Sequence, residues 1–394
     1  MCFMLSNSFQ INVNKNVFAH LFTRFLKERR RVLCLLPFGF AATLFFIFSF
    51  STPAFSQTFE GVPSVAKDAI GARDPIFHEP VSRGIHLVFN GQVEESLVIF
   101  DRLLKEYPDQ PAPHFFKAAA YQVWMSHYRL SKFQNEFEEN VKSAISKGEA
   151  LLKTDSDPWV HFYVGAAYGY QAFNRFRKHE WIGAYLDSKK GIKHLKETLV
   201  LDQNVYDVYL AFGTYHYWRT AKSNFLRFIA FWIPDKRELG LRQLEFSVAH
   251  GQYSPFEASY ALIAAYFDYG KYESAYALLN RTIEKKTQSS FSDLYLKAHL
   301  FIKFERLQEA ENLLVDLLQR LESSKYPSVG YQVECKYWIA FILKSQKKTS
   351  EARAISEQAL AQSEKRNADL EVESTFENFQ DIKDNLKTLV RELS

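Results

Sequence analysis

Four histidines in the middle of the chain are the side chains best suited to chemistry. Neutral imidazoles bind transition metals and also act as general bases. The four are separated by 18, 15 and 22 residues, whereas metal motifs use short fixed spacings and a supporting second shell of hydrogen bonds. We therefore interpret them as ordinary polar or packing residues and predict no metal ligand among them: His161, His179, His194 and His216.

The sequence contains no recognisable catalytic motif. It lacks the HExxH zinc helix, the GxSxG nucleophile turn, the Walker phosphate loop and the GxGxxG dinucleotide turn. Gly270-Lys271 has no glycine five residues earlier, so it is interpreted as a turn. Of the three cysteines, Cys2, Cys34 and Cys335, only the last lies beyond residue 56, and one thiol forms neither an intramolecular disulfide nor a zinc site. We expect a protein without catalytic activity, cofactor or metal.

The positive charge of the chain is concentrated at its beginning. The formal net charge is +4, but six of the 49 basic residues and one of the 45 acidic residues lie in residues 1–56. The remaining body therefore has a net charge of −1. This distribution gives no reason to expect nucleic-acid binding.

Residues 1–56 have the organisation of an export signal. Arg29, Arg30 and Arg31 precede residues 32–50, which carry no charge, and Ala54 and Ser56 occupy the −3 and −1 positions of a cleavage site. This pattern predicts a secretory signal peptide. The apolar run is also near the length of a membrane span, so an uncleaved signal anchor is the alternative. Both interpretations place the body outside the cytoplasm, in the periplasm or cell envelope.

The body repeats itself with a fixed period. The run Ala118-Ala119-Ala120-Tyr121 is followed 47 residues later by Gly165-Ala166-Ala167-Tyr168, and Ala144 is matched at the same offset by Gly191. A period of this size is typical of a solenoid, in which each unit buries its apolar face against its neighbours. The low content of glycine (15) and proline (12) favours long helices over many short strands.

The repeat closely resembles the tetratricopeptide repeat (TPR) family. That family places small residues at positions 8, 20 and 27 and aromatic residues at positions 11 and 24 of a 34-residue helical hairpin. The best match is the sequence YFDYGKYESA, with Tyr266, Gly270, Tyr272 and Ala275 at motif positions. The resemblance implies an all-α, right-handed superhelix of about seven hairpins with a C-terminal capping helix. It covers about 290 of the 394 residues.

The predicted domain organisation follows from these units. Small residues pair across each hairpin, and in the second and third units the motif is lengthened by 14 residues, enough for about two extra turns on each helix. We predict four segments: a signal peptide or anchor at 1–56, a linker at 57–76, a solenoid at 77–366 with enlarged hairpins at 111–254, and a capping helix at 367–394.

The resemblance also implies a binding face. In the family, positions 2, 5, 9, 12 and 13 of each first helix line the concave surface of the superhelix. One interpretation is that this surface is a groove for a protein, a peptide or an apolar ligand. The other is that the enlarged helices pack across the groove and bury these side chains as additional core. The candidate residues are Phe115, Gln122, Trp159, Phe162, Tyr170, Tyr217, Trp218, Tyr260, Phe267 and Tyr295, with Leu210, Tyr337 and Phe341 at equivalent places.

Two other features are candidates for contacts with a partner or a membrane. Residues 225–234, from Phe225 to Pro234, are apolar except for Arg227, and they either tuck into the superhelix or form a patch for a partner or membrane surface. The basic clusters at 175–179 and at Lys236-Arg237 are interpreted either as solvated hairpin tips or as a contact for anionic lipid or polymer.

The functional hypotheses follow from the resemblance. The first is a non-catalytic scaffold that binds a protein or peptide in the periplasm or envelope. The second is a periplasmic ligand-binding component that serves a transporter, and an enzyme is the third. A closed apolar cavity would favour the second hypothesis and an open groove the first, whereas a polar pocket with converging histidines and carboxylates would favour the third.

Overall fold

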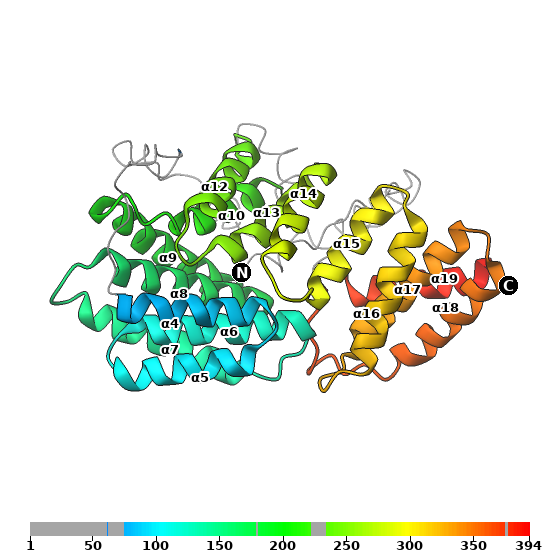
Figure 1. Ribbon diagram of the computed structural model, residues 1–394, viewed down its shortest axis with the longest axis horizontal. Helices are drawn as coiled ribbons and strands as arrows, with labels where there is room; N and C mark the ends of the chain where they lie inside the picture. Colours follow the sequence, from blue (N-terminus) through cyan, green and yellow to red (C-terminus); the bar gives the residue numbers. More distant parts are fainter. Residues whose placement is uncertain (1–60, 62–74, 179, 222–233, 375–376) are drawn as a thin grey trace, which may run out of the picture.

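The computed structural model describes residues 61, 75–178, 180–221, 234–374 and 377–394. These residues form fifteen helices and no strand longer than an isolated bridge (Figure 1). The all-α TPR-like solenoid expected from the sequence is thereby confirmed. The predicted signal region at 1–56, nearly all of the linker and most of residues 225–234 lie outside the described residues. Within the described part, no helix is both long and apolar enough to cross a membrane.

Consecutive helices pair into hairpins. Those of the second and third units have 18 to 21 residues against 13 to 16 in the fifth and sixth. The fourth unit, which the predicted enlarged stretch 111–254 includes, has two described helices of 14 residues each. The pairs are α4 (Pro75–Phe89) and α5 (Val93–Glu106), α6 (Pro111–Tyr128) and α7 (Gln134–Leu151), α8 (Pro158–Arg177) and α9 (Trp181–Leu201), α10 (Val208–Ala221) and α12 (Arg237–His250), α13 (Pro255–Asp268) and α14 (Tyr272–Glu284), α15 (Phe291–Lys303) and α16 (Leu307–Glu322), and α17 (Val329–Ser345) and α18 (Thr349–Ser363), followed by α19 (Phe379–Glu392).

Glycines allow the helices of the enlarged hairpins to cross closely. A Cβ atom added to Gly165 would lie 3.0 Å from the carbonyl oxygen of Gly191, and one added to Gly191 would lie 2.8 Å from the carbonyl oxygen of Gly165. Gly213 and Gly240 have the same relation in the next hairpin, at 2.9 and 2.7 Å. The predicted close crossing in the third unit is therefore confirmed, because only a residue without a side chain lets the two backbones approach this far.

The turns inside the shorter hairpins require a left-handed residue. Gly91 and Gly270 take φ values of +80° between their helices, which costs a glycine little. Glu305 and Lys347 occupy the corresponding place in the sixth and seventh hairpins with φ values of 59° and 64°. The sixth and seventh hairpins therefore keep the turn geometry of the motif although they lack its glycine.

The first two hairpins contact the later ones directly, across the superhelix. Phe89 of α4 stacks on Phe256 and Tyr260 of α13, with ring centroids 5.0 and 6.0 Å apart. The Asn90 side chain accepts a hydrogen bond from the backbone N–H of Thr287, 2.7 Å away. The first hairpin therefore covers part of the concave surface that the sequence pattern left open.

The C-terminal capping helix is shorter than predicted. The expectation was a helix over 367–394, but α19 begins at Phe379, where the Asn378 side chain caps it by accepting from the backbone N–H of Gln380. The non-helical residues before it run back to the second hairpin, and Leu130 and Glu371 form an isolated antiparallel bridge. The apolar stripe of α19 is buried as expected, through Ile382, Leu386 and Leu389.

Candidate functional site: an apolar cavity

A large cavity lies among the first, second, third and fourth hairpins. Its volume is about 1200 Å³, and its walls come from α4, α6, α8, α9, α10 and the non-helical stretch at 368–374. The helices that supply the walls lie side by side in the left half of Figure 1. This volume slightly exceeds the usual range of small-molecule pockets, about 300–1,000 Å³.

The cavity exists because small residues alternate with aromatic rings along its walls. Phe115, Phe162 and Tyr170 supply rings, and Phe115 stacks on Tyr170 with ring centroids 5.6 Å apart. Ala166 and Gly169 of α8 also line the cavity, and they leave unfilled the volume that larger side chains would occupy. The result is an apolar concave surface with few polar groups, which is the usual character of a binding pocket.

The cavity has an aromatic rim at the tip of the third hairpin. Phe176 at the end of α8 and Trp181 at the start of α9 pack edge to face, 5.0 Å between ring centroids, and both are about half exposed. Tyr185 and Tyr215 extend this rim and are 49% and 37% exposed. The cavity is therefore reached from solvent across a belt of aromatic side chains.

Two polar groups on the cavity wall form hydrogen bonds within the fold. The buried Asp207 carboxylate accepts hydrogen bonds from the backbone N–H groups of Gln252, Tyr253 and Ser254 at 2.7 to 2.9 Å. The Tyr170 hydroxyl donates to Glu257 at 3.5 Å. These hydrogen bonds join the cavity wall to the start of α13.

The structure separates the predicted site residues into two groups. Phe115, Phe162, Tyr170, Trp218 and Leu210 line the cavity. Three tyrosines bind neighbouring helices instead. Tyr217 is fully buried, and its hydroxyl donates to the Ala265 carbonyl and to Asp268. Tyr260 donates to Asp293, and Tyr295 donates to Glu334. Gln122, Phe267 and Tyr337 are buried, Trp159 is partly buried against Tyr253, and Phe341 is 37% exposed on α17.

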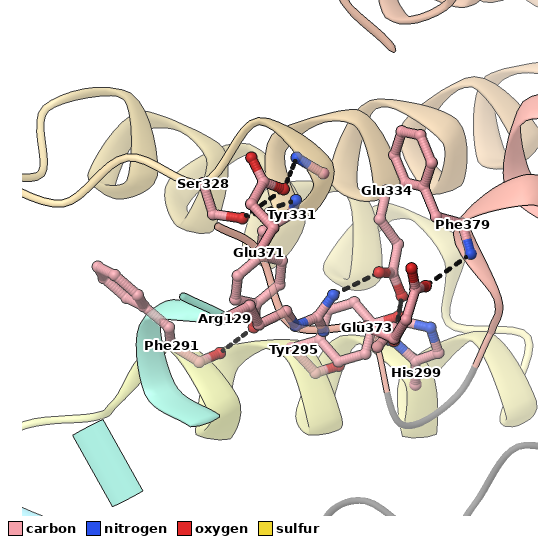
Figure 2. Close-up of polar contacts among 12 residues, drawn as sticks. Arg129, Phe291, Tyr295, His299, Ser328, Tyr331, Glu334, Glu371, Glu373 and Phe379 are labelled. Atoms are coloured by element: carbon pink, nitrogen blue, oxygen red, sulfur yellow. Dashed lines mark hydrogen bonds and ion pairs between the residues drawn. The ribbon is translucent and has the colours of Figure 1, made fainter. Parts of the chain in front are cut away.

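A buried polar cluster lies where the second hairpin meets the seventh (Figure 2). Arg129, the left-handed residue that ends α6, forms an ion pair with Glu334 of α17, 205 residues away in the sequence. Its guanidinium lies over the rings of Tyr331 and Tyr295, 3.5 and 4.7 Å from their centroids. Ser374 donates a second hydrogen bond to Glu334 at 2.9 Å, so both charges are paired within the fold.

The stretch at 368–374 completes this cluster. The Glu371 carboxylate accepts hydrogen bonds from the backbone N–H groups of Val329 and Gly330, at 2.9 and 2.7 Å, and thereby caps α17. The same stretch lines the cavity. Cavity and cluster are therefore connected through one segment of backbone.

The four central histidines do not converge. The Nδ1 atoms of His161 and His194 are 3.0 Å apart, and burial, followed by the nearby His161, lowers the pKa of His194 to about 4. His216 is buried against Gln243, 2.7 Å away, and His179 lies outside the described residues. In the part of the chain that the structure describes, no three His, Cys, Asp or Glu side chains are placed to hold a metal ion.

The sequence analysis did not identify the rim of the cavity. Trp181, Ile182, Tyr185 and Leu186 were not considered because they fall outside the motif positions, in the lengthened part of the third hairpin. Their spacing of i, i+1, i+4 and i+5 places them on one face of a helix whose other face has its own apolar residues. This double apolar pattern is the signal that could have revealed them.

Comparisons with known proteins agree with the repeat fold. Residues 249–317 match the family described as anaphase-promoting complex, cyclosome, subunit 3. No curated protein has a significantly similar sequence. Similar solved structures include PilW, a widely conserved type IV pilus biogenesis factor, with 14% identity and a TM-score of 0.40 over 58% of this chain and 88% of that one.

Two further solved structures are similar at the same level. They are the C-terminal part of a TPR repeat-containing protein from Cytophaga hutchinsonii (16% identity, TM-score 0.35, 71% of this chain and 94% of that one) and the apo form of RapI (14% identity, TM-score 0.36, 74% and 77%). Likenesses of this degree carry no information about the function of this chain.

Proposed function

We propose that this chain, a TPR-like repeat protein, is a non-catalytic scaffold of the bacterial periplasm or cell envelope that binds an apolar segment of a protein partner in its cavity. The observation that carries the proposal is the cavity of about 1200 Å³ with its aromatic rim. TPR-type scaffolds are typically protein-interaction modules. The location rests on the export signal of the sequence, with its arginines before an uncharged run at 32–50.

The apolar wall by itself favours a small ligand, but the cavity is reached from solvent across its exposed aromatic rim, so a short apolar segment of a protein can also enter it. Five predicted concave residues line it, and the first hairpin covers other parts of the concave surface through Phe89 and Asn90. A partner side chain or short helix that enters across Phe176 and Trp181 would bury its apolar surface against aromatic rings that the fold already holds in position. Aromatic residues supply much of the binding energy at such sites.

A small apolar ligand delivered to a transporter is the second candidate. It is favoured by the chemistry of the wall, where aromatic and small aliphatic side chains predominate and Asp207 is occupied by backbone N–H groups. Residues 225–234 stay a predicted contact for a partner or membrane surface.

A photo-crosslinking amino acid on the cavity wall tests the proposal. Placed at Ala211 in the full chain expressed in its native envelope, it should give a discrete protein adduct under ultraviolet light. Placed at Val98, which is 70% exposed on α5 and does not line the cavity, it should not. Extraction and mass spectrometry of the same sample distinguish a bound small molecule from a protein segment.

A second variant shows whether the adduct depends on the cavity itself. Ala166→Phe fills part of the volume from α8, whereas Ala211 belongs to α10, and it should remove the crosslink at position 211 while the melting temperature is maintained. An adduct that survives this substitution would place the partner outside the cavity. A small-molecule adduct alone would support the second candidate.

A further inference from the structure

The exposed face of α9 carries two kinds of side chain in sequence. Its first half presents Trp181, Ile182, Tyr185 and Leu186, which are 49 to 79% exposed. Its second half presents the exposed lysines 189, 190 and 193. These positions follow a spacing of i, i+1, i+4, i+5, i+8, i+9 and i+12, so all seven side chains lie on one side of the helix.

The apolar half is the densest group of exposed large hydrophobic side chains in the part of the chain that the structure describes. Phe176 at the end of α8 adds to it, and its ring packs against Trp181 at 5.0 Å. Ile182 and Leu186, which are 79% and 52% exposed, do not line the cavity. Exposure of this much contiguous apolar surface at a hairpin tip is typical of a contact surface rather than of a solvated end.

The charged side chains beside this apolar group are mostly basic. The neighbouring acidic groups Glu180 and Asp187 are both engaged by Arg175, at 4.0 and 3.0 Å, and Lys178 pairs with Glu138. Among the described residues, Lys189, Lys190 and Lys193 form no ion pair. Lys189 lies over the ring of Tyr185 and Lys190 over that of Tyr168, 5.8 and 5.1 Å from the ring centroids. Three cations without a carboxylate partner therefore follow directly behind the apolar tip.

We propose that this face of α9, the α9 face, docks on a bilayer that contains anionic phospholipid. Helices that lie at a membrane interface combine aromatic and aliphatic side chains, buried about 5–10 Å into the headgroup and acyl boundary, with lysines that meet the phosphates. The rise from Ile182 to Lys190 is about 12 Å at 1.5 Å per residue. The apolar half thus enters the interface while the lysines reach the headgroup phosphates.

This docking does not depend on what occupies the cavity. Trp181 and Tyr185 belong to both the rim and the α9 face, whereas Ile182, Leu186 and the lysines belong to the face alone. Substitutions at the second set therefore leave the cavity wall unchanged. They allow the docking proposal and the scaffold proposal to fail separately.

An environment-sensitive fluorescent amino acid at position 182 tests the docking. In the full chain isolated from the envelope, its emission should shift to the blue with vesicles of phosphatidylcholine and 30% phosphatidylglycerol, and spin-labelled lipid should quench it. The same probe at Val98 should show neither change. Val98 is 70% exposed but lies beside the exposed acidic residues 94, 95 and 101. Because the readout is local to one residue, a retained N-terminal segment does not produce it.

Charge reversal is the decisive variant. Lys189→Glu with Lys190→Glu should lower the ratio of lipid-contacting to free probe by roughly tenfold or more, since each lysine near an anionic surface contributes about 1 kcal/mol. Circular dichroism melting should be unchanged because both side chains are exposed. An equal response to pure phosphatidylcholine would overturn the proposal, as would a response to dextran sulfate without vesicles, which would indicate a soluble polyanion.

Discussion

The cavity and the Arg129–Glu334 cluster differ in how their interiors are filled. The cavity wall combines rings with Ala166 and Gly169, and it leaves about 1200 Å³ without protein atoms. In the cluster Arg129 and Glu334 pair with each other, and the guanidinium lies over the rings of Tyr331 and Tyr295. Both regions join hairpins that are distant in the sequence. The comparison shows that the fold is closely packed where the second and seventh hairpins meet, whereas it leaves space among the first four hairpins.

Removal of one charge of the cluster should have the largest effect. Glu334→Ala leaves Arg129 buried without its carboxylate and removes the acceptor used by Tyr295 and Ser374, so we expect a loss of about 3–5 kcal/mol in the free energy of unfolding. Urea denaturation measures it. Replacing both charges, with Arg129→Met and Glu334→Leu, should restore most of the loss. A single variant that costs under about 1 kcal/mol would mean that the cluster is dispensable.

Substitutions at two adjacent residues of α8, Gly165 and Ala166, compare the packed helix crossing with the cavity. Gly165→Leu should lower stability by about 1–3 kcal/mol or more, because even a Cβ there would lie 2.8 Å from the Leu195 side chain. Ala166→Leu adds similar bulk toward the cavity, and we expect a change of less than about 1 kcal/mol. Thermal melting of both variants provides the comparison. Equal losses would show that the cavity does not have the space described.

Glu377 feels the charge of Glu334 in the cluster, and its buried Oε2 atom has no hydrogen-bond partner among the described residues, so it should make stability depend on pH. Burial, followed by the charges of Glu334 and Asp381, raises the pKa of Glu377 from 4.5 to about 8. Between these values the folded protein holds a proton that the unfolded chain has released, so stability should fall as pH rises from 4.5 to 8. Denaturation midpoints across this range measure the slope. Glu377→Gln should flatten it, and an unchanged slope would assign the dependence to another group.

The smallest expected effect lies at the turn of the seventh hairpin. Lys347 has a φ of 64°, a conformation that costs a side-chain-bearing residue about 1–2 kcal/mol and a glycine little. Glycine is also more flexible in the unfolded chain, so Lys347→Gly should stabilise by only about 0.5–1 kcal/mol. Differential scanning calorimetry would detect this. The same change at the neighbouring Lys348, which is not left-handed, should not stabilise.

The sequence predicted those features that depend on local spacing. The hairpins, their lengths in the second and third units and the glycine crossing at Gly165 and Gly191 follow from periodicity and from the need for small residues where helices cross. Of the predicted concave residues, Phe115, Phe162, Tyr170 and Trp218 line the cavity, and their role in binding stays a prediction.

Other features could not be predicted because they depend on how far the superhelix turns. Tyr260 and Tyr295 occupy concave motif positions, but their hydroxyl groups bind Asp293 and Glu334 after the first hairpins have covered that face. Likewise, nothing in the local pattern at 367–378 indicates that Glu371 caps α17 and pairs with Leu130. These contacts join residues far apart in the sequence, which a repeat motif does not describe.

The bridge between Leu130 and Glu371 has a consequence for the way this protein unfolds. In an open solenoid each repeat contacts only its neighbours, so terminal repeats fray and the array loses cooperativity as it lengthens. Here the second hairpin and the residues after the seventh hairpin hold each other, which makes the array a closed loop. When one of these two segments separates from the other, both become exposed to solvent. We therefore expect amide protons of α6 and α17 to exchange with solvent together, on one timescale, although 200 residues separate the two helices.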